Sequence, residues 1–274
     1  MEQLLANPAI QSAVIPFVTA LAAALILRRF GWVWAGLGLA LAFYLSVYIT
    51  VGLEFTPLTS THKIILLGLL AMVVGLLVDA RRSESRNATY ILAALTAAAV
   101  LWVIWPVASR KAGTEFWMLI VPSMLYSAIV VVLFERLKPD SMKSTAALLA
   151  IGVGTGVCAL LGASAKLGQL GGAIGAAAGA YILILLFSRQ LRLGSSFTFT
   201  GALLVSLIGV AGVVYAKLPW YILLILLSIP AILTLPIRLR LAHIPSPIVY
   251  TCAVLIPAGI AIYITLQIAG APPV

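Results

Sequence analysis

Residues 151–180 read IGVGTGVCALLGASAKLGQLGGAIGAAAGA, a stretch that is more than half glycine and alanine and carries a single charged residue. It covers most of two apolar runs, 144–162 and 166–187, each about as long as a helix that crosses a bilayer. The stretch therefore predicts two consecutive membrane-spanning helices.

Three glycines of this stretch, Gly171, Gly175 and Gly179, recur every four residues and so share one helix face. Small residues on one face let the backbone of another helix approach closely. We expect these glycines to serve helix packing. The alternative is a broken helix or re-entrant turn around residues 162–168, where free backbone groups and Lys166 would line a solvated cavity.

The rest of the chain is as apolar as this stretch. Its 274 residues are 63% hydrophobic and 9% charged, with a mean hydropathy of +1.18. A soluble domain carries about 25% charged residues, so this composition excludes a soluble enzyme, a nucleic-acid-binding protein and a disordered chain. Barrel strands would show alternating segments of about ten residues, which these runs lack. The sequence predicts an all-α polytopic integral membrane protein.

Ten apolar runs are long enough to span a bilayer, and they leave too few residues for a domain outside the membrane. We therefore expect a single membrane domain over residues 1–274. The predicted spans are 8–27, 31–53, 63–79, 88–107, 116–135, 144–162, 166–187, 197–216, 219–236 and 246–268.

The formal charge of +10 comes from basic residues that stand in short clusters between the apolar runs, which is the pattern of topology signals. Twelve lie on one predicted side: Arg28, Arg29, Arg81, Arg82, Arg86, Arg136, Lys138, Lys143, Arg189, Arg192, Arg238 and Arg240. Five lie on the other: Lys63, Arg110, Lys111, Lys166 and Lys217. The first side is predicted to be cytoplasmic, in the inner membrane of a bacterium, with both termini outside.

An internal repeat is also predicted. Shifting the chain by 103 residues lays the second to fifth spans over the sixth to ninth, with the charged loops in matching order. The repeat units would be 31–137 and 141–240, each of four helices in parallel orientation, with 8–27 and 246–268 as flanking helices. Carriers are often built from such repeats.

Two lysines, Lys63 and Lys166, each begin a span on the predicted outer side. As a pair at the mouth of a central cavity they would attract an anionic solute, and with Ser164 and Gln169 they form the predicted substrate-binding set. Two other interpretations remain: the lysines reach to the headgroups with their stems in lipid, or Lys63 pairs locally within its own loop, which also holds Glu54 and His62.

All seven acidic residues lie in tails, loops or at span ends: Glu2, Glu54, Asp79, Glu84, Glu115, Glu135 and Asp140. Ion-coupled carriers usually hold a carboxylate within the membrane, so we expect a mechanism without a buried coupling carboxylate. No motif for catalysis, metal binding or haem ligation is present. The sequence therefore predicts no enzyme activity, no metal and no cofactor.

Polar side chains in the middle of the spans offer another path for a neutral or weakly polar solute, although such groups more often bond to a neighbouring helix. They are Ser123, Tyr126, Ser127, Thr155, Gln169, Ser206, Ser228, Thr251 and Gln267. Prolines within four spans, at positions 16, 122, 230 and 257, can kink their helices.

These patterns favour a small secondary carrier or facilitator for an organic anion or a lipid-like solute. The alternative is a non-catalytic accessory or scaffold subunit of a larger membrane complex. The predicted partners are membrane lipids, with other membrane subunits or further copies of this chain under the second hypothesis, and no nucleic acid. An enclosed central polar cavity would favour the carrier, and a filled interior with an exposed small-residue face would favour the subunit.

Overall fold

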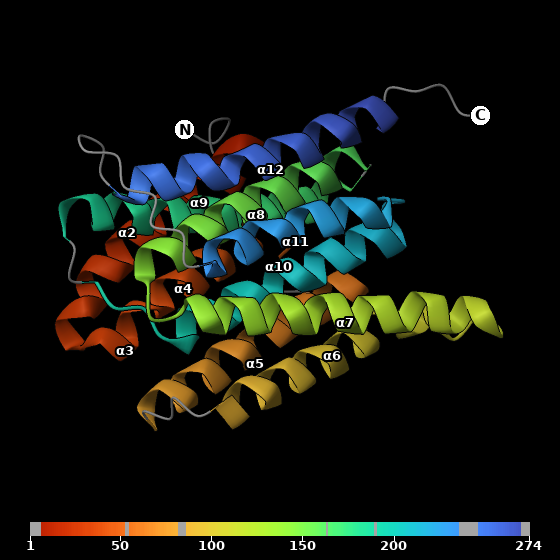
Figure 1. Cartoon of the computed structure of the whole chain (residues 1–274), viewed down its shortest axis with the longest axis horizontal. Coiled ribbons are helices and arrows are strands. Elements are labelled where there is room, and N and C mark those ends of the chain that lie inside the picture. The colour runs from red at the N-terminus through yellow and green to blue at the C-terminus, as the bar shows by residue number, and fades with distance from the viewer. Residues whose placement is uncertain are drawn as a thin grey trace.

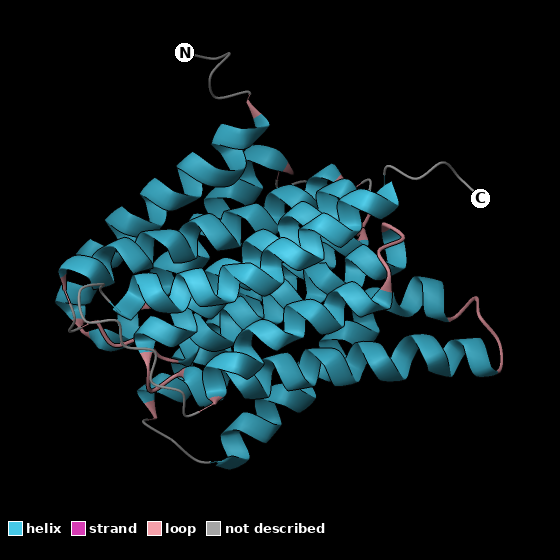
Figure 2. Ribbon diagram, turned by 45° about the horizontal axis from the view of Figure 1, so that its top comes forward, coloured by secondary structure: helices cyan, strands magenta, loops and turns pink. Residues whose placement is uncertain are grey.

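The fold is seen in a computed structural model that describes residues 7–52, 55–81, 86–162, 164–188, 191–235 and 246–269. Over these residues the regular elements are all helices, and most run side by side along the long axis of the molecule (Figures 1 and 2). The prediction of an all-α polytopic membrane protein is confirmed.

Nine helical segments within the described residues are long and apolar enough to cross a membrane. The first consists of η1 (Ile10–Val14), α2 (Ile15–Leu27) and η2 (Arg28–Phe30), and the second of α3 (Trp32–Ala35) and α4 (Leu37–Thr50). The others are α5 (Ser60–Ala80), α6 (Arg86–Ala108), α7 (Thr114–Leu137), α8 (Ser141–Leu161), α9 (Ala165–Phe187), α10 (Ser195–Tyr215) and α12 (Ser246–Ala269).

The ninth predicted span, 219–236, forms the shorter helix α11 (Trp220–Thr234). Fifteen helical residues extend about 22 Å, less than the roughly 30 Å of a hydrocarbon core. Helix α5 is longer than its predicted span 63–79, because the Thr59 side chain caps its first turn and starts the helix earlier.

Helix α10 is the centre of the bundle. It packs against α4, α5, α6, α7, α8, α9 and α11, and 89% of its span is buried, compared with 17% for the first span. Every residue from Ser195 to Gly212 is buried. The centre of this protein is therefore a filled helix–helix interface.

Helices α8 and α9 cross closely at their glycines. A Cβ atom on Gly171 would lie 2.6 Å from the Cα of Gly156, and one on Gly175 would lie 2.8 Å from the backbone nitrogen of Val153. At Gly179 the nearest atom, Leu149 Cδ1, would be at an ordinary 3.5 Å. The first two glycines thus permit the close crossing, while the third does not limit it.

The predicted break in residues 162–168 is a connection between two separate helices, since α8 ends at Leu161 and α9 begins at Ala165. Gly162 continues the turn, with its N–H donating to the Cys158 carbonyl. Residue 163 lies outside the described residues. The backbone around Lys166 is therefore ordinary helix.

The helices alternate in direction, so successive loops, with the basic residues that they carry, lie at opposite ends of the bundle. Helices α5 and α7 end, and α8 and α10 begin, at one end (Figure 1). Arg82, Arg189, Arg238 and Arg240 of the larger basic group lie outside the described residues, as do Glu2, Glu54 and Glu84 among the acids.

Candidate functional site

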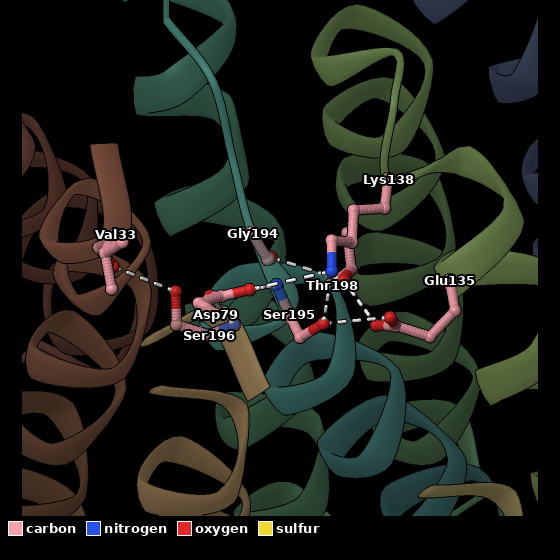
Figure 3. Close-up of polar contacts among 8 residues, drawn as sticks. All are labelled: Val33, Asp79, Glu135, Lys138, Gly194, Ser195, Ser196 and Thr198. Atoms are coloured by element: carbon pink, nitrogen blue, oxygen red, sulfur yellow. Dashed lines mark hydrogen bonds and ion pairs between the residues drawn. The ribbon is translucent and has the colours of Figure 1, made fainter. Parts of the chain in front are cut away.

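A charged cluster lies where the last turns of α5 and α7 meet the first turn of α10. We define the cluster as Asp79, Glu135, Lys138, Ser195 and Thr198 (Figure 3). The side chain of Asp79 has no exposed surface, and that of Lys138 is 18% exposed. Asp79 lies at a span end, as predicted, but neighbouring helices enclose that end and bury the carboxylate. Whether it takes part in coupling stays untested.

Asp79 caps the central helix from outside it. Its two carboxylate oxygens accept hydrogen bonds from the backbone N–H groups of Ser195 at 2.7 Å and Ser196 at 2.8 Å. These donors have no partner within their own helix, and the positive end of the helix dipole favours a negative charge there. Asp79 thereby fixes α5 against α10.

Gly194 makes this cap possible. It occupies the position before α10 where a serine, threonine or aspartate would normally supply its own capping oxygen, and no side chain caps the helix from there. A Cβ atom on Gly194 would overlap the Asp79 carboxylate. The absence of a side chain therefore leaves room for a cap that arrives from α5.

Lys138 and Glu135 complete the cluster from α7. The Lys138 ammonium donates to Ser195 Oγ at 3.0 Å and lies 3.6 Å from Asp79 Oδ1. Ser195 Oγ in turn donates to Glu135 Oε2 at 2.9 Å, and Thr198 Oγ1 donates to Glu135 Oε1 at 2.6 Å. Both oxygens of Glu135 are thus held by hydroxyls of α10.

The cluster contains two carboxyl groups and one ammonium. The Asp79 charge is matched by Lys138 and by two backbone N–H groups, whereas Glu135 receives hydrogen bonds only from neutral hydroxyls. Glu135 is partly buried and is held by weaker donors than Asp79, which makes it the candidate proton acceptor of the cluster. The described residues contain no group of three or more His, Cys, Asp and Glu side chains placed to bind a metal.

A groove of about 480 Å³ opens between α6 and α7 at the same end of the bundle. It is lined by Thr89 and Tyr90 of α6 and by Val132 and Arg136 of α7. The two α7 residues flank Glu135 in the sequence. The groove therefore brings a polar, basic surface to the turn of α7 that carries the cluster.

Lys63 of the predicted substrate-binding set is bound to α6. Its ammonium donates to the Trp102 carbonyl at 3.0 Å and lies 5.2 Å from the centroid of the Trp102 ring. That carbonyl would normally accept from residue 106, but Pro106 has no N–H to donate. Lys63 thus satisfies a carbonyl that a proline leaves without its helical partner.

The other members of that set lie on α9 or just before it. Ser164 precedes the helix without capping it, Lys166 is exposed in its first turn, and Gln169 is half-buried. Helices α4 and α10 both pack against α5 and against α9, and so lie between Lys63 and Lys166. Lys63 is bonded to α6. Its predicted pairing with Lys166 at the mouth of one cavity stays a prediction.

No protein-family model and no curated protein matches this sequence.

Proposed function

We propose that this protein is a small secondary carrier for an organic anion or a lipid-like solute. The charged cluster would couple the movement of the solute to the movement of a proton. The observation that carries the proposal is the buried Asp79 carboxylate together with the partly buried Lys138 and Glu135 at the junction of three membrane-spanning helices. Ionisable side chains in such positions are costly and usually mark ion or solute pathways.

The stability of the folded protein does not by itself explain why this cluster is charged. Replacing a buried ion pair by well-packed apolar residues is often neutral or stabilising. Apolar contacts could thus replace Lys138 and Glu135 if α5, α7 and α10 only had to hold together, whereas the Asp79 carboxylate also caps α10. Three ionisable groups at this junction are better explained by a change of protonation during function.

The proposal includes a location and an orientation. We place the protein in the cytoplasmic membrane of a bacterium, with the cluster at the cytoplasmic end, because the larger group of basic residues lies in the loops at that end. The termini would then lie outside. The internal repeat of 31–137 and 141–240 belongs to the same proposal.

A second candidate is an accessory subunit of a membrane complex, and one observation favours it. Helix α10 is buried continuously from Ser195 to Gly212, which is the filled interior expected of a scaffold. The small-residue faces of α8 and α9, however, pack against each other within this chain, so they are not free to receive a partner.

The experiment is uptake by liposomes that contain the purified protein. Radiolabelled lactate, succinate and glutamate probe organic anions, and a fluorescent phosphatidylglycerol probes lipids, each with and without an imposed pH gradient. We expect faster movement of one probe than in protein-free liposomes, with loss of the pH dependence in Glu135→Gln. Glu115→Gln is the matched control, because Glu115 is exposed and pairs only with Lys111 among the described residues.

Movement of no probe, together with a stoichiometric partner that co-purifies from the native membrane in gentle detergent, would replace the carrier by the subunit. Movement that is equally pH-dependent in Glu135→Gln would remove the cluster from the mechanism.

A further inference from the structure

Two buried hydroxyls in the middle of the bundle lack a hydrogen-bond partner within the part of the chain that the structure describes. Tyr126 of α7 is 4% exposed and Thr155 of α8 is fully buried. Neither Tyr126 Oη nor Thr155 Oγ1 forms a hydrogen bond with any atom of the described residues. Buried polar groups in proteins almost always have a partner, so both require an explanation.

The two side chains border the same glycine. A Cβ atom on Gly209 of α10 would lie 3.5 Å from Tyr126 Oη and 3.7 Å from Thr155 Cγ2. Gly209 has no side chain to separate them, and the nearest other atom is Leu223 Cδ2 at 3.1 Å. The Tyr126 hydroxyl and the methyl group of the Thr155 side chain, from two helices, thus both lie beside Gly209 of a third helix.

This point is close to the middle of the membrane-spanning segments. Tyr126 is at the midpoint of α7, while Thr155 and Gly209 lie about one turn beyond the midpoints of α8 and α10. Carriers bind their solutes near this depth. The third unpartnered hydroxyl, Thr200, is nine residues before Gly209, which places it on the opposite face of α10.

Other hydroxyls of the bundle show how a helix normally satisfies such a group. Thr96, Ser127 and Thr265 each donate to the carbonyl four residues earlier on the same helix, at 2.7–2.9 Å. Thr155 has the same option and does not take it. A tyrosine hydroxyl has no such bond to its own helix, so Tyr126 depends on a partner from elsewhere.

We propose that Tyr126, Thr155 and Gly209 form a binding site for one small molecule that presents a hydrogen-bonding oxygen: water, or an oxygen of the transported solute. A hydroxyl can donate to such an oxygen and, for water, can also accept. The binding of a water or solute oxygen atom beside Gly209 does not depend on the proposed function. Only its assignment to a solute in transit rests on that function.

The test is thermal unfolding of the full-length protein in lipid nanodiscs, in buffer without organic solute. If water occupies the site, Tyr126→Phe lowers the midpoint by about 2–4 °C. In a Gly209→Ala background, where the added methyl group displaces the water and leaves the Tyr126 hydroxyl without a partner, the same substitution leaves the midpoint unchanged or raises it. Tyr181→Phe calibrates the scale, because the Tyr181 hydroxyl is buried and bonded to the Ala35 carbonyl.

If instead the site takes only a solute, the loss in Tyr126→Phe appears when the transported probe is added, and the KM for that probe rises in the variant. Without a transported probe, the measurement in buffer still decides whether water binds. Should Gly209→Ala not fold, radical footprinting of wild-type protein gives a second readout, because a bound water makes Tyr126 reactive.

A midpoint that stays unchanged or rises in Tyr126→Phe, both with and without the probes, together with an unreactive Tyr126 in footprinting, would overturn the proposal. The hydroxyl would then be unpartnered in the native protein.

Discussion

The carboxylate of Asp79 accepts a hydrogen bond of 2.7 Å from the backbone N–H of Ser195, across 116 residues of sequence. One side chain in the last turn of α5 thereby caps α10, the helix around which the bundle is built. This contact links the stability of the central helix to the charge state of the cluster.

Removal of the cap should be the most destabilising single change in the cluster. Asp79→Ala leaves two backbone donors of α10 and the Lys138 ammonium without their acceptor, so we expect a loss of about 3–5 kcal/mol in the free energy of unfolding. Asp79→Asn keeps one acceptor oxygen and should lose less. Thermal unfolding in detergent measures both, with Glu115→Ala, an exposed acid, as the control. Equal midpoints for Asp79→Ala and Glu115→Ala would contradict the capping role.

Gly194 should tolerate no side chain while Asp79 is present. We expect Gly194→Ala to lower the thermal midpoint strongly, because its methyl group would meet the Asp79 carboxylate. In the Asp79→Ala background the same substitution should cost much less. Gly259→Ala is the matched control: no atom lies within 4 Å of its added Cβ, so it should be neutral or raise stability by up to about 1 kcal/mol. Additive effects at 194 and 79 would argue against a direct contact.

The close crossing of α8 and α9 predicts an order among glycines. Gly171→Ala places its methyl group 2.6 Å from the Cα of Gly156, whereas Gly179→Ala meets only ordinary contacts. We expect a clear fall in the unfolding midpoint for the first and little change for the second, measured side by side in the same detergent. The reverse order would mean that the two helices cross elsewhere.

Lys63 and Pro106 should be thermodynamically coupled. Lys63→Met removes the donor to the Trp102 carbonyl, and we expect a loss of about 1 kcal/mol, since the lysine is partly exposed. Pro106→Ala restores a backbone N–H that can reach the same carbonyl, so Lys63→Met should then have little effect. A double-mutant cycle by chemical unfolding measures the coupling. A cycle without coupling would return Lys63 to the substrate-binding hypothesis.

The predicted orientation can be checked with single cysteines in a chain whose Cys158 and Cys252 are replaced by alanine. Lys166→Cys should react with an impermeant thiol reagent added outside intact cells, and Arg81→Cys should react only after the cells are opened. Labelling in the opposite pattern would invert the topology and move the cluster to the outer end.

The class of fold follows from the sequence alone. Apolar runs of about 20 residues admit few structures other than membrane-spanning helices, because every backbone polar group in lipid must bond within its own segment. The alternation of strongly and weakly basic loops between these runs was also visible in the sequence. The sequence also identified Tyr126 and Thr155 as polar residues in mid-span, since depth along a helix can be counted from its ends.

Which of these residues contact one another depends on how the helices pack in three dimensions. Asp79 and Glu135 were correctly placed at span ends, but hydropathy reports depth along a helix and says nothing of which helices enclose that end. The partner of Asp79 is a pair of backbone N–H groups 116 residues away. Almost every residue has a backbone N–H group, so the sequence of side chains does not show which ones serve as partners. The pairing of Lys63 with the carbonyl freed by Pro106 was hidden for the same reason: it depends on the neighbour of α5, and that neighbour is set by packing in three dimensions.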